Sequence, residues 1–219
     1  MAIYTSKTRI DLEDVGYSNK ITNKAILKIL ENAGARQSET IHFGLNDMEN
    51  VGFSWILLGW KVKILKRPIY NEELTINTWG RESNRIFTYR DYEIYDESGE
   101  LCTIATSKWA IVDINTGKLR ELTPEIIEKY QCETKKVFKE DYTLKLKEPT
   151  TIIRKQEYKA QRRDIDINKH IHNLYYLDYA YEVLPEEVYE APECNNIEIM
   201  YKKQIRLNDE FKCLYTKEK

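Results

Sequence analysis

The sequence predicts an α+β protein built from a duplicated unit, in which each copy sets a long helix beside an antiparallel sheet. Two observations predict this. Residues 14–27 align without a gap on residues 164–177, and the same order of elements follows each stretch. Helical periodicity comes first in each unit, and apolar or alternating runs typical of strands come next. The alternative, a chance similarity of two loop-to-helix junctions, stays open.

The first helix is expected over residues 18–32. Ser18 or Asn19 can cap its start, because short polar side chains accept hydrogen bonds from the first free backbone N–H groups. Gly34 is expected to end it, since glycine readily adopts the left-handed conformation that follows many helices. The apolar positions of this helix are Ile21, Ala25, Leu27 and Ile29.

A sheet is expected to follow the first helix. Residues 96–99, Asp-Glu-Ser-Gly, form a hairpin turn between its last two strands. A short helix over residues 123–130 then begins at Thr123 and Pro124, since proline is favoured in the first turn of a helix. The expected strands are residues 53–65, 73–79, 86–95 and 101–112.

The second unit repeats this order with fewer elements. Residues 60–77 resemble residues 197–214, which supports the duplication, but two strands of the first sheet have no counterpart in the second. We therefore expect an N-terminal domain at 1–130, a charged linker at 131–149 and a short C-terminal domain at 150–219. Its expected elements are an extended segment at 158–161, a helix from 173 to about 184 and a strand at 196–206.

The composition excludes several classes of protein. The chain has 219 residues, and its 34 basic and 36 acidic side chains give a net charge of −2, which offers no electrostatic case for nucleic acid. No apolar run is long enough to span a membrane and the start lacks a signal-peptide pattern, so a cytoplasmic location is expected. The four cysteines are scattered, which indicates neither a zinc site nor a disulfide framework. We expect no cofactor and no metal ion.

One polar run carries the candidate chemistry. Asp166, Asn168 and His170 alternate along residues 164–173, and alternate residues of an extended segment point to one side. This places a proton acceptor, an amide dipole and a titratable ring on one face just before a helix. The copies share scaffold residues but differ in these polar residues, so we expect only the second copy to be catalytic. The first copy has Gly16, Ser18 and Lys20 at the three positions.

A structural interpretation of the same run stays open. Asp166 and Asn168 are also residue types that cap helices and form turns. His172 is interpreted as a solvated or structural neighbour and is left out of the candidate site.

Several separated motifs, in order, resemble the acyl-ACP thioesterases. The resemblance covers nearly the whole chain and implies a tandem hotdog fold, each domain a long helix wrapped by an antiparallel sheet. It also implies hydrolysis of the thioester between a fatty acyl chain and acyl carrier protein, in fatty acid biosynthesis. The motifs are Asp-x-Asn-x-His-x-x-Asn in the second half, with Trp55-Ile56-Leu57, Thr78-Trp79, Tyr89-Arg90-Asp91-Tyr92 and Ser107-Lys108-Trp109 in the first.

The resemblance assigns the family's catalytic Asp, Asn and His to Asp166, Asn168 and His170. Asp166 would activate water or attack the carbonyl, Asn168 would orient it or polarise the thioester, and His170 would supply a proton or stabilise charge. A helix starting after His172 would offer free backbone N–H groups. The family's further carboxylate falls on Gln204, which cannot accept a proton as a carboxylate does.

Substrate contacts are expected from both halves. Apolar strand residues of the first unit would line an acyl tunnel, although most of them are expected to be ordinary core: Trp55, Leu57, Trp60 and Phe87, with Ile64 beside them. Basic residues near the site would meet an acidic acyl carrier protein that bears a phosphopantetheine-linked acyl chain, or would form only a solvated face. They are Arg162, Arg163, Lys169, Lys202 and Lys203.

Two other functions stay open. A hotdog enzyme that acts on acyl-CoA would use the same catalytic run. A non-catalytic acyl-binding module would fit Gln204 and the short second unit. A homodimer is compatible with all three.

Overall fold

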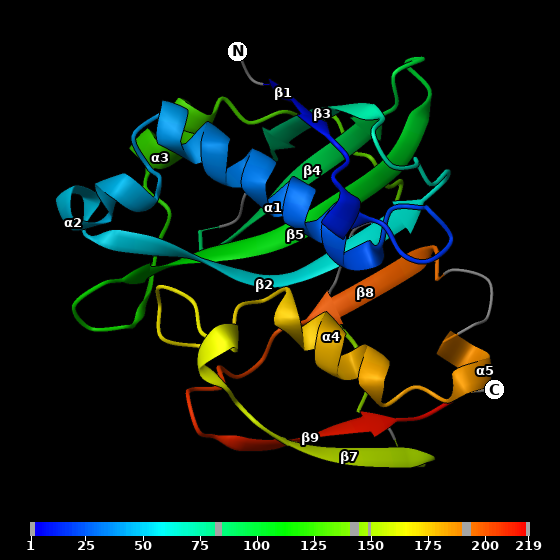
Figure 1. Cartoon of the computed structure of the whole chain (residues 1–219). Helices are drawn as coiled ribbons and strands as arrows, with labels where there is room; N and C mark the ends of the chain where they lie inside the picture. The colour runs from blue at the N-terminus through cyan, green and yellow to red at the C-terminus, as the bar shows by residue number, and fades with distance from the viewer. Residues whose placement is uncertain (1–2, 82–84, 141–144, 149, 190–193, 218–219) are drawn as a thin grey trace. The chain divides into compact units, whose positions relative to one another are not determined.

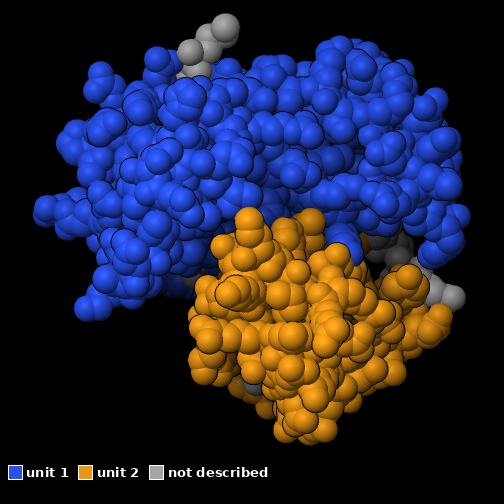
Figure 2. Space-filling model, turned by 60° about the vertical axis from the view of Figure 1, so that its left-hand side comes forward, with its two compact units in different colours: residues 1–145, 195–200 blue, residues 146–194, 201–219 orange. Residues whose placement is uncertain are grey.

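The computed structural model divides the chain into two compact units, shown in separate colours in Figure 2. The first comprises residues 1–145 and 195–200, and the second residues 146–194 and 201–219. No helix among the described residues is both long and apolar enough to cross a membrane. The structure describes residues 3–81, 85–140, 145–148, 150–189 and 194–217.

An antiparallel sheet forms the first unit, in the strand order β1-β3-β4-β5-β2-β8, with β6 paired to β5. Helix α1 runs across one face of this sheet (Figure 1). The expected strands of this unit are present, whereas β1 and β6 were not predicted from the sequence. The bounds are β1 Tyr4–Arg9, β2 Phe53–Ile64, β3 Glu73–Gly80, β4 Phe87–Tyr95, β5 Leu101–Asp113, β6 Leu119–Arg120 and β8 Asn196–Met200.

Helix α1 spans Asn23–Thr40, so both predicted ends are wrong. The Thr22 hydroxyl accepts from the Ala25 N–H at 3.1 Å and caps the helix, because the chain around Ser18 turns back on itself first. Gly34 lies within the helix, where a Cβ would come within 3.0 Å of the Tyr92 hydroxyl. The glycine therefore permits close packing and does not end the helix. The short helices of this unit are α2, Met48–Val51, and α3, Pro124–Tyr130.

Part of the predicted linker is bound to the first unit. The Val137 N–H donates to the buried Asp91 carboxylate at 3.0 Å, and the Lys135 ammonium lies 2.7 Å from the Glu93 carboxylate. The Trp79 indole N–H donates to the Lys135 carbonyl at 3.0 Å. These bonds fix the chain after α3 against strands β3 and β4.

The second unit pairs β7 with β9 in a two-stranded antiparallel sheet. Tyr179, Tyr158 and Phe211 form an aromatic cluster on it, with ring centroids 4.8–5.7 Å apart. Among the described residues this unit has no strand equivalent to β4 or β5. The strand expected over 196–206 stops at Met200, and that part belongs to the first unit. The bounds are β7 Arg154–Lys159, α4 Tyr175–Glu182, α5 Glu186–Tyr189 and β9 Glu210–Tyr215.

The backbone of the two copies forms the same hydrogen bonds, which confirms the duplicated fold. The Ile10 N–H donates to the Glu72 carbonyl, and the equivalent Ala160 N–H donates to the Asp209 carbonyl, both at 3.0 Å. The numbering offset is 150 before the helices (160 − 10) and 137 after them (209 − 72). Equivalent residues also share a left-handed φ, namely Asn19 and Lys169, and Asn71 and Asn208.

Strand β8 pairs with its own repeat counterpart, β2. Lys61 lies opposite Glu198, and 198 − 61 = 137, the offset that relates the two copies. A residue paired with its own equivalent has the register of an isologous contact, which is the contact made across a two-fold axis.

Candidate active site

The predicted catalytic run is a tight turn. The Asp166 N–H donates to the His170 carbonyl at 2.8 Å, and the Lys169 N–H donates to the Asp166 carbonyl at 3.0 Å. Lys169 has a left-handed φ of 64°, which reverses the chain. The expectation of an extended segment is therefore wrong, and alternation along a strand does not bring these side chains together. The turn instead folds residues 166–170 back on themselves, so that the backbone N–H groups of Asn168 and His170 meet the Asp166 carboxylate.

The first copy forms the same turn from different residues. The Gly16 N–H donates to the Lys20 carbonyl at 3.0 Å, and the Asn19 N–H donates to the Gly16 carbonyl at 2.9 Å. Asn19 has the φ, 59°, that matches Lys169. The fold of this loop therefore does not require Asp, Asn and His at the three positions.

Asp166 has one carboxylate oxygen bound to the turn. Its Oδ1 accepts the N–H of Asn168 at 2.8 Å and the N–H of His170 at 3.3 Å. This is the turn-forming role that the structural interpretation foresaw, but Gly16 shows that the turn forms without it. The structure gives Oδ2 no hydrogen bond to any described residue. One oxygen thus fixes the carboxylate while the other stays available to a ligand.

Asn168 is exposed and His170 is half-buried. Neither side chain forms a hydrogen bond with the part of the chain that the structure describes. An exposed amide and a half-buried imidazole without a hydrogen-bond partner among the described residues are available to bind substrate or water.

Gln204 lies outside the strands, in the segment after β8, and is exposed. The neighbouring Ile205 carbonyl accepts the Ile171 N–H at 2.8 Å, and Arg206 pairs with His170. This backbone pairing brings the Gln204 segment alongside the turn. All four predicted catalytic residues therefore lie in the second unit, on two adjoining segments.

The start of helix α4 differs from the prediction. The helix begins at Tyr175, and the His172 Nδ1 accepts the Leu174 N–H at 3.3 Å. The Tyr175 N–H donates to the His172 carbonyl at 2.9 Å. These two N–H groups are thus occupied by His172 and are not offered to a thioester oxygen, which corrects that expectation. His172 has the structural role that the sequence suggested.

A buried carboxylate supports the turn in each copy. Asp164, which is 4% exposed, accepts the Tyr179 hydroxyl at 2.5 Å and the Gln161 N–H at 2.9 Å. Burial, and then the Asp164 carboxylate, raise the pKa of the Tyr179 phenol to about 12. In the first copy the equivalent Asp14 instead forms an ion pair with Lys28.

The predicted tunnel residues all lie in the first unit. Trp60 is fully buried against Tyr92, with ring centroids 5.3 Å apart, and Leu57 is 7% exposed. Trp55 is half-buried and meets the Tyr130 ring edge-on at 5.6 Å. Phe87 is half-buried, with the Lys108 ammonium 4.2 Å from its ring centroid. Trp60 is thus a core residue, as expected for most of this set.

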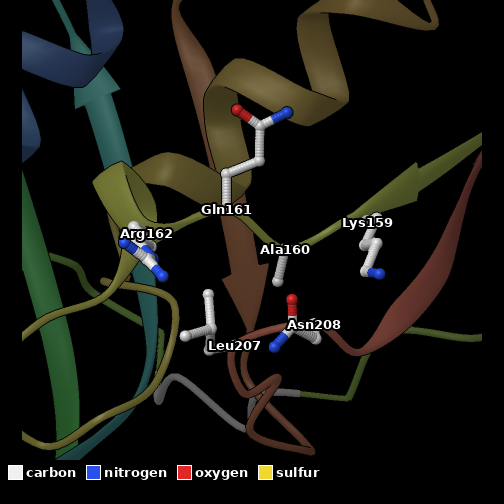
Figure 3. Close-up of a pocket in the computed structure, with 6 residues that line it drawn as sticks. All are labelled: Lys159, Ala160, Gln161, Arg162, Leu207 and Asn208. Carbon is white, nitrogen blue, oxygen red and sulfur yellow. The ribbon is translucent and has the colours of Figure 1, made fainter.

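The predicted basic contacts are exposed. Arg162 also lines a depression of about 340 Å³ in the second unit, which includes none of the predicted catalytic residues. Figure 3 shows the Ala160 and Asn208 side chains directed toward each other and Gln161 directed away from them. We place the candidate site at the turn and not in this depression, because the turn carries the groups capable of proton transfer. The remaining basic residues are Arg163, Lys169, Lys202 and Lys203.

Two residues near the site, and one at the equivalent place in the first copy, were not predicted from the sequence. Tyr176 and Tyr201 contact the Gln204 segment and the start of α4, and Arg67 occupies the position of Gln204 in the first copy (204 − 67 = 137). The second repeat pairing could have revealed Arg67, since it aligns residue 67 with residue 204. The tyrosine contacts had no local sequence signal.

Family models match nearly the whole chain, in two parts. The family model described as the acyl-ACP thioesterase N-terminal domain matches residues 1–130, and the acyl-ACP thioesterase C-terminal domain matches residues 147–219. Oleoyl-acyl carrier protein thioesterase 1, chloroplastic, from Arabidopsis thaliana is 24% identical over 94% of this chain and 61% of its own length. A Coriandrum sativum oleoyl-acyl carrier protein thioesterase is 25% identical over 94% and 60%. The chain thus spans about three fifths of the length of these relatives.

Solved structures share the fold, which is the predicted tandem hotdog. An acyl-ACP thioesterase from Bacteroides thetaiotaomicron has a TM-score of 0.84 at 22% identity, over 95% of this chain and 84% of that one. The 12:0-ACP thioesterase from Umbellularia californica has a TM-score of 0.86 at 18% identity, over 98% and 87%. A DHNA-CoA thioesterase from Staphylococcus aureus has a TM-score of 0.54 at 22% identity, over 60% of this chain and 90% of that one.

Proposed function

We propose, because this chain belongs to the acyl-ACP thioesterase family, that it hydrolyses the thioester of a fatty acyl-[acyl carrier protein] in fatty acid biosynthesis. One observation carries the proposal. The first copy forms the turn with Gly16, Ser18 and Lys20, so Asp166, Asn168 and His170 are not there for the fold. Side chains that the fold does not require, and that remain unbonded within the described chain, are candidates for chemistry.

The Asp166 carboxylate is the proposed reactive group. Its Oδ1 is fixed by two backbone N–H groups, so Oδ2 is the oxygen that takes a proton from water. The water oxygen then bonds to the thioester carbon, and collapse of the tetrahedral intermediate breaks the C–S bond. The proton passes to the departing sulfur, giving free fatty acid and the carrier thiol. His170 would relay that proton from Asp166 to the sulfur, which restores the Asp166 carboxylate, and Asn168 would orient the water or polarise the carbonyl.

Direct attack by Asp166 on the carbonyl is the second mechanism. It would form an acyl anhydride with the Asp166 carboxylate and release the thiol before water enters. Mass spectrometry of enzyme quenched during turnover separates the two. An acyl adduct on Asp166 supports direct attack, and its absence during rapid turnover supports water activation.

Substrate recognition is proposed to involve both units. Trp55, Leu57 and Phe87 would line the acyl chain's path, with Trp60 supporting them from the core. The exposed basic residues of the second unit, Arg162, Arg163, Lys169, Lys202 and Lys203, would meet the acidic carrier protein, since opposite charges mainly increase the rate of encounter. Neutralising these residues should then raise KM for acyl carrier protein more than KM for the corresponding acyl-pantetheine.

A thioesterase assay of the purified protein tests the proposal. We expect hydrolysis of palmitoyl-carrier protein, and the same acyl chain on CoA to be a poorer substrate. A preference for palmitoyl-CoA would indicate that the substrate is an acyl-CoA and not an acyl-[acyl carrier protein]. Tight acyl binding without turnover, over a panel of chain lengths, would contradict the enzyme and favour an acyl-binding module.

A further inference from the structure

The segment beside the turn is held by an arginine in the first copy. Arg67 donates from Nη1 to the Ile21 carbonyl at 2.8 Å and from Nη2 to the Asn23 Oδ1 at 2.6 Å. Asn23 is 8% exposed. The side chain of this buried asparagine, at the start of α1, is therefore occupied by Arg67 in the first copy.

The second copy replaces that arginine by Gln204 and keeps the asparagine as Asn173. Here two tyrosines bind the main chain instead. The Tyr201 hydroxyl donates to the Asn173 carbonyl at 3.2 Å, and the Tyr176 hydroxyl donates to the Lys203 carbonyl at 3.4 Å. Their rings meet edge-on at 5.6 Å. The tyrosines thus join the start of α4 to the Gln204 segment without using either amide side chain.

The Asn173 amide is left without a structural role. The structure gives it no hydrogen bond to a described residue. The N-cap of α4 is Leu174, whose own N–H donates to the His172 Nδ1 at 3.3 Å. An asparagine at a helix start usually serves as the cap. Asn173 does not cap α4. It lies three residues after His170, which is a member of the catalytic turn.

We propose that Asn173 is a further substrate-binding residue, whose amide N–H donates to the thioester carbonyl oxygen, and that Tyr176 and Tyr201 are positioning residues that hold it. The inference rests on the proposed function and adds a donor to it. A fixed neutral donor is suited to stabilising the negative charge that develops on this oxygen. Arg67 in the first copy shows how the same amide is occupied when the copy is silent.

Asn173→Ala tests the amide, with Asn23→Ala as the matched control in the silent copy. We expect Asn173→Ala to lower kcat/KM by about 10²-fold, as loss of one oxyanion donor does. Its affinity for a nonhydrolysable thioether analogue of acyl-pantetheine that keeps a carbonyl group should also fall. Asn23→Ala should leave kcat/KM unchanged. Wild-type affinity and turnover in folded Asn173→Ala would overturn the inference.

The binding measurement separates this inference from the proposed function. If the wild type binds the analogue but hydrolyses no thioester, the proposed activity fails while the Asn173 contact is still tested by affinity. If the wild type hydrolyses the thioester and Asn173→Ala does so equally well, the activity stands and the inference fails.

Gln204→Arg tests whether an arginine closes the site as in the first copy. Arginine at this position would donate to the Ile171 carbonyl and to the Asn173 Oδ1, as Arg67 does to their equivalents. We expect activity and analogue binding to be lost together, with no loss of thermal stability. A fully active Gln204→Arg enzyme would contradict the inference.

Tyr201→Phe tests the positioning role. It removes the hydroxyl and keeps the ring, so a merely structural ring would leave kcat unchanged. We expect kcat to fall about tenfold with little change in KM, since a misplaced donor acts mainly on the transition state. Unchanged kcat in both Tyr201→Phe and Tyr176→Phe would remove the tyrosines from the proposal.

Discussion

The turn at residues 14–23 and the turn at 164–173 have the same backbone and different chemistry. Both reverse the chain at a left-handed residue, and both rest on a buried aspartate, Asp14 or Asp164. Only the second has a carboxylate, an amide and an imidazole on the turn. Because the shared hydrogen bonds account for the fold in both places, the unshared side chains indicate function. The first copy can therefore serve as a control for the second within the same chain.

The largest effect should come from Asp166→Asn. The asparagine Oδ1 can still accept the two backbone N–H groups, so the turn should form, but the amide cannot accept a proton. We expect kcat to fall by about 10²–10⁴-fold, measured by release of the carrier thiol.

The matched change in the first turn, which lacks the three candidate catalytic residues, is Gly16→Asn. A Cβ at Gly16 would meet only the Thr22 methyl, at 3.8 Å, so the substitution fits. It should leave turnover unchanged. Near-normal turnover in Asp166→Asn, or a comparable loss in Gly16→Asn, would break the distinction between the two turns.

Tyr179→Phe should mainly affect stability. The phenol hydroxyl donates to the buried Asp164 carboxylate at 2.5 Å, and its loss leaves that charge with one bond fewer. We expect the free energy of unfolding to fall by about 1–3 kcal/mol, measured by urea denaturation. The control is Tyr189→Phe, since Tyr189 is 53% exposed. Equal stability of Tyr179→Phe and the wild type would show that Asp164 finds another donor.

The same tyrosine predicts a pH dependence. Its folded pKa is raised from 10.0 to about 12, by burial and by Asp164. The raised pKa contributes stability that is complete below pH 10 and lost as the pH rises toward 12, because the unfolded phenol ionises first. Tyr179→Phe should lack this alkaline slope.

Gln204→Glu should have a smaller effect, on rate. It restores the carboxylate that the family resemblance places there, and we expect a severalfold rise in kcat, mostly where the new group is ionised. A pH–rate profile measures this. A fall that is greatest at low pH would mean that the new charge raises the pKa of Asp166. No change at any pH would place Gln204 outside the site.

The smallest effect should come from grafting the catalytic residues into the first turn. Gly16→Asp, Ser18→Asn and Lys20→His together, with Asp166→Asn in the background, should give no turnover, because Arg67 still binds Asn23. Adding Arg67→Gln should give the first detectable turnover. Activity in the triple graft alone would show that the first copy remains latent.

Local sequence patterns predicted most elements of the first unit. Alternating apolar residues and the Asp96 turn fixed the strands of that sheet, because side-chain period and turn chemistry are local properties. The end of α1 was predicted wrongly because Gly34 serves close packing and not helix termination. The side chains that pack against it, Tyr92 and Arg90, are distant in sequence. The early stop of β8 also depends on a partner strand, β2.

The candidate site was predictable only where it is continuous in sequence. Asp166, Asn168 and His170 are found from their spacing and from the lost equivalents in the first copy. Tyr201 and Tyr176 are not, because their bonds join the Gln204 segment to the start of α4, across 28 and 27 residues. Such contacts are consequences of the fold and leave no periodic signal.

The pairing of Lys61 with Glu198 has an evolutionary consequence. Two identical subunits meeting at this register would share every mutation, so any change that silenced one reaction centre would silence both. Joining the copies in one chain removes that constraint. Position 67 can then hold an arginine while position 204 holds a glutamine, so that two copies of one backbone carry different side chains.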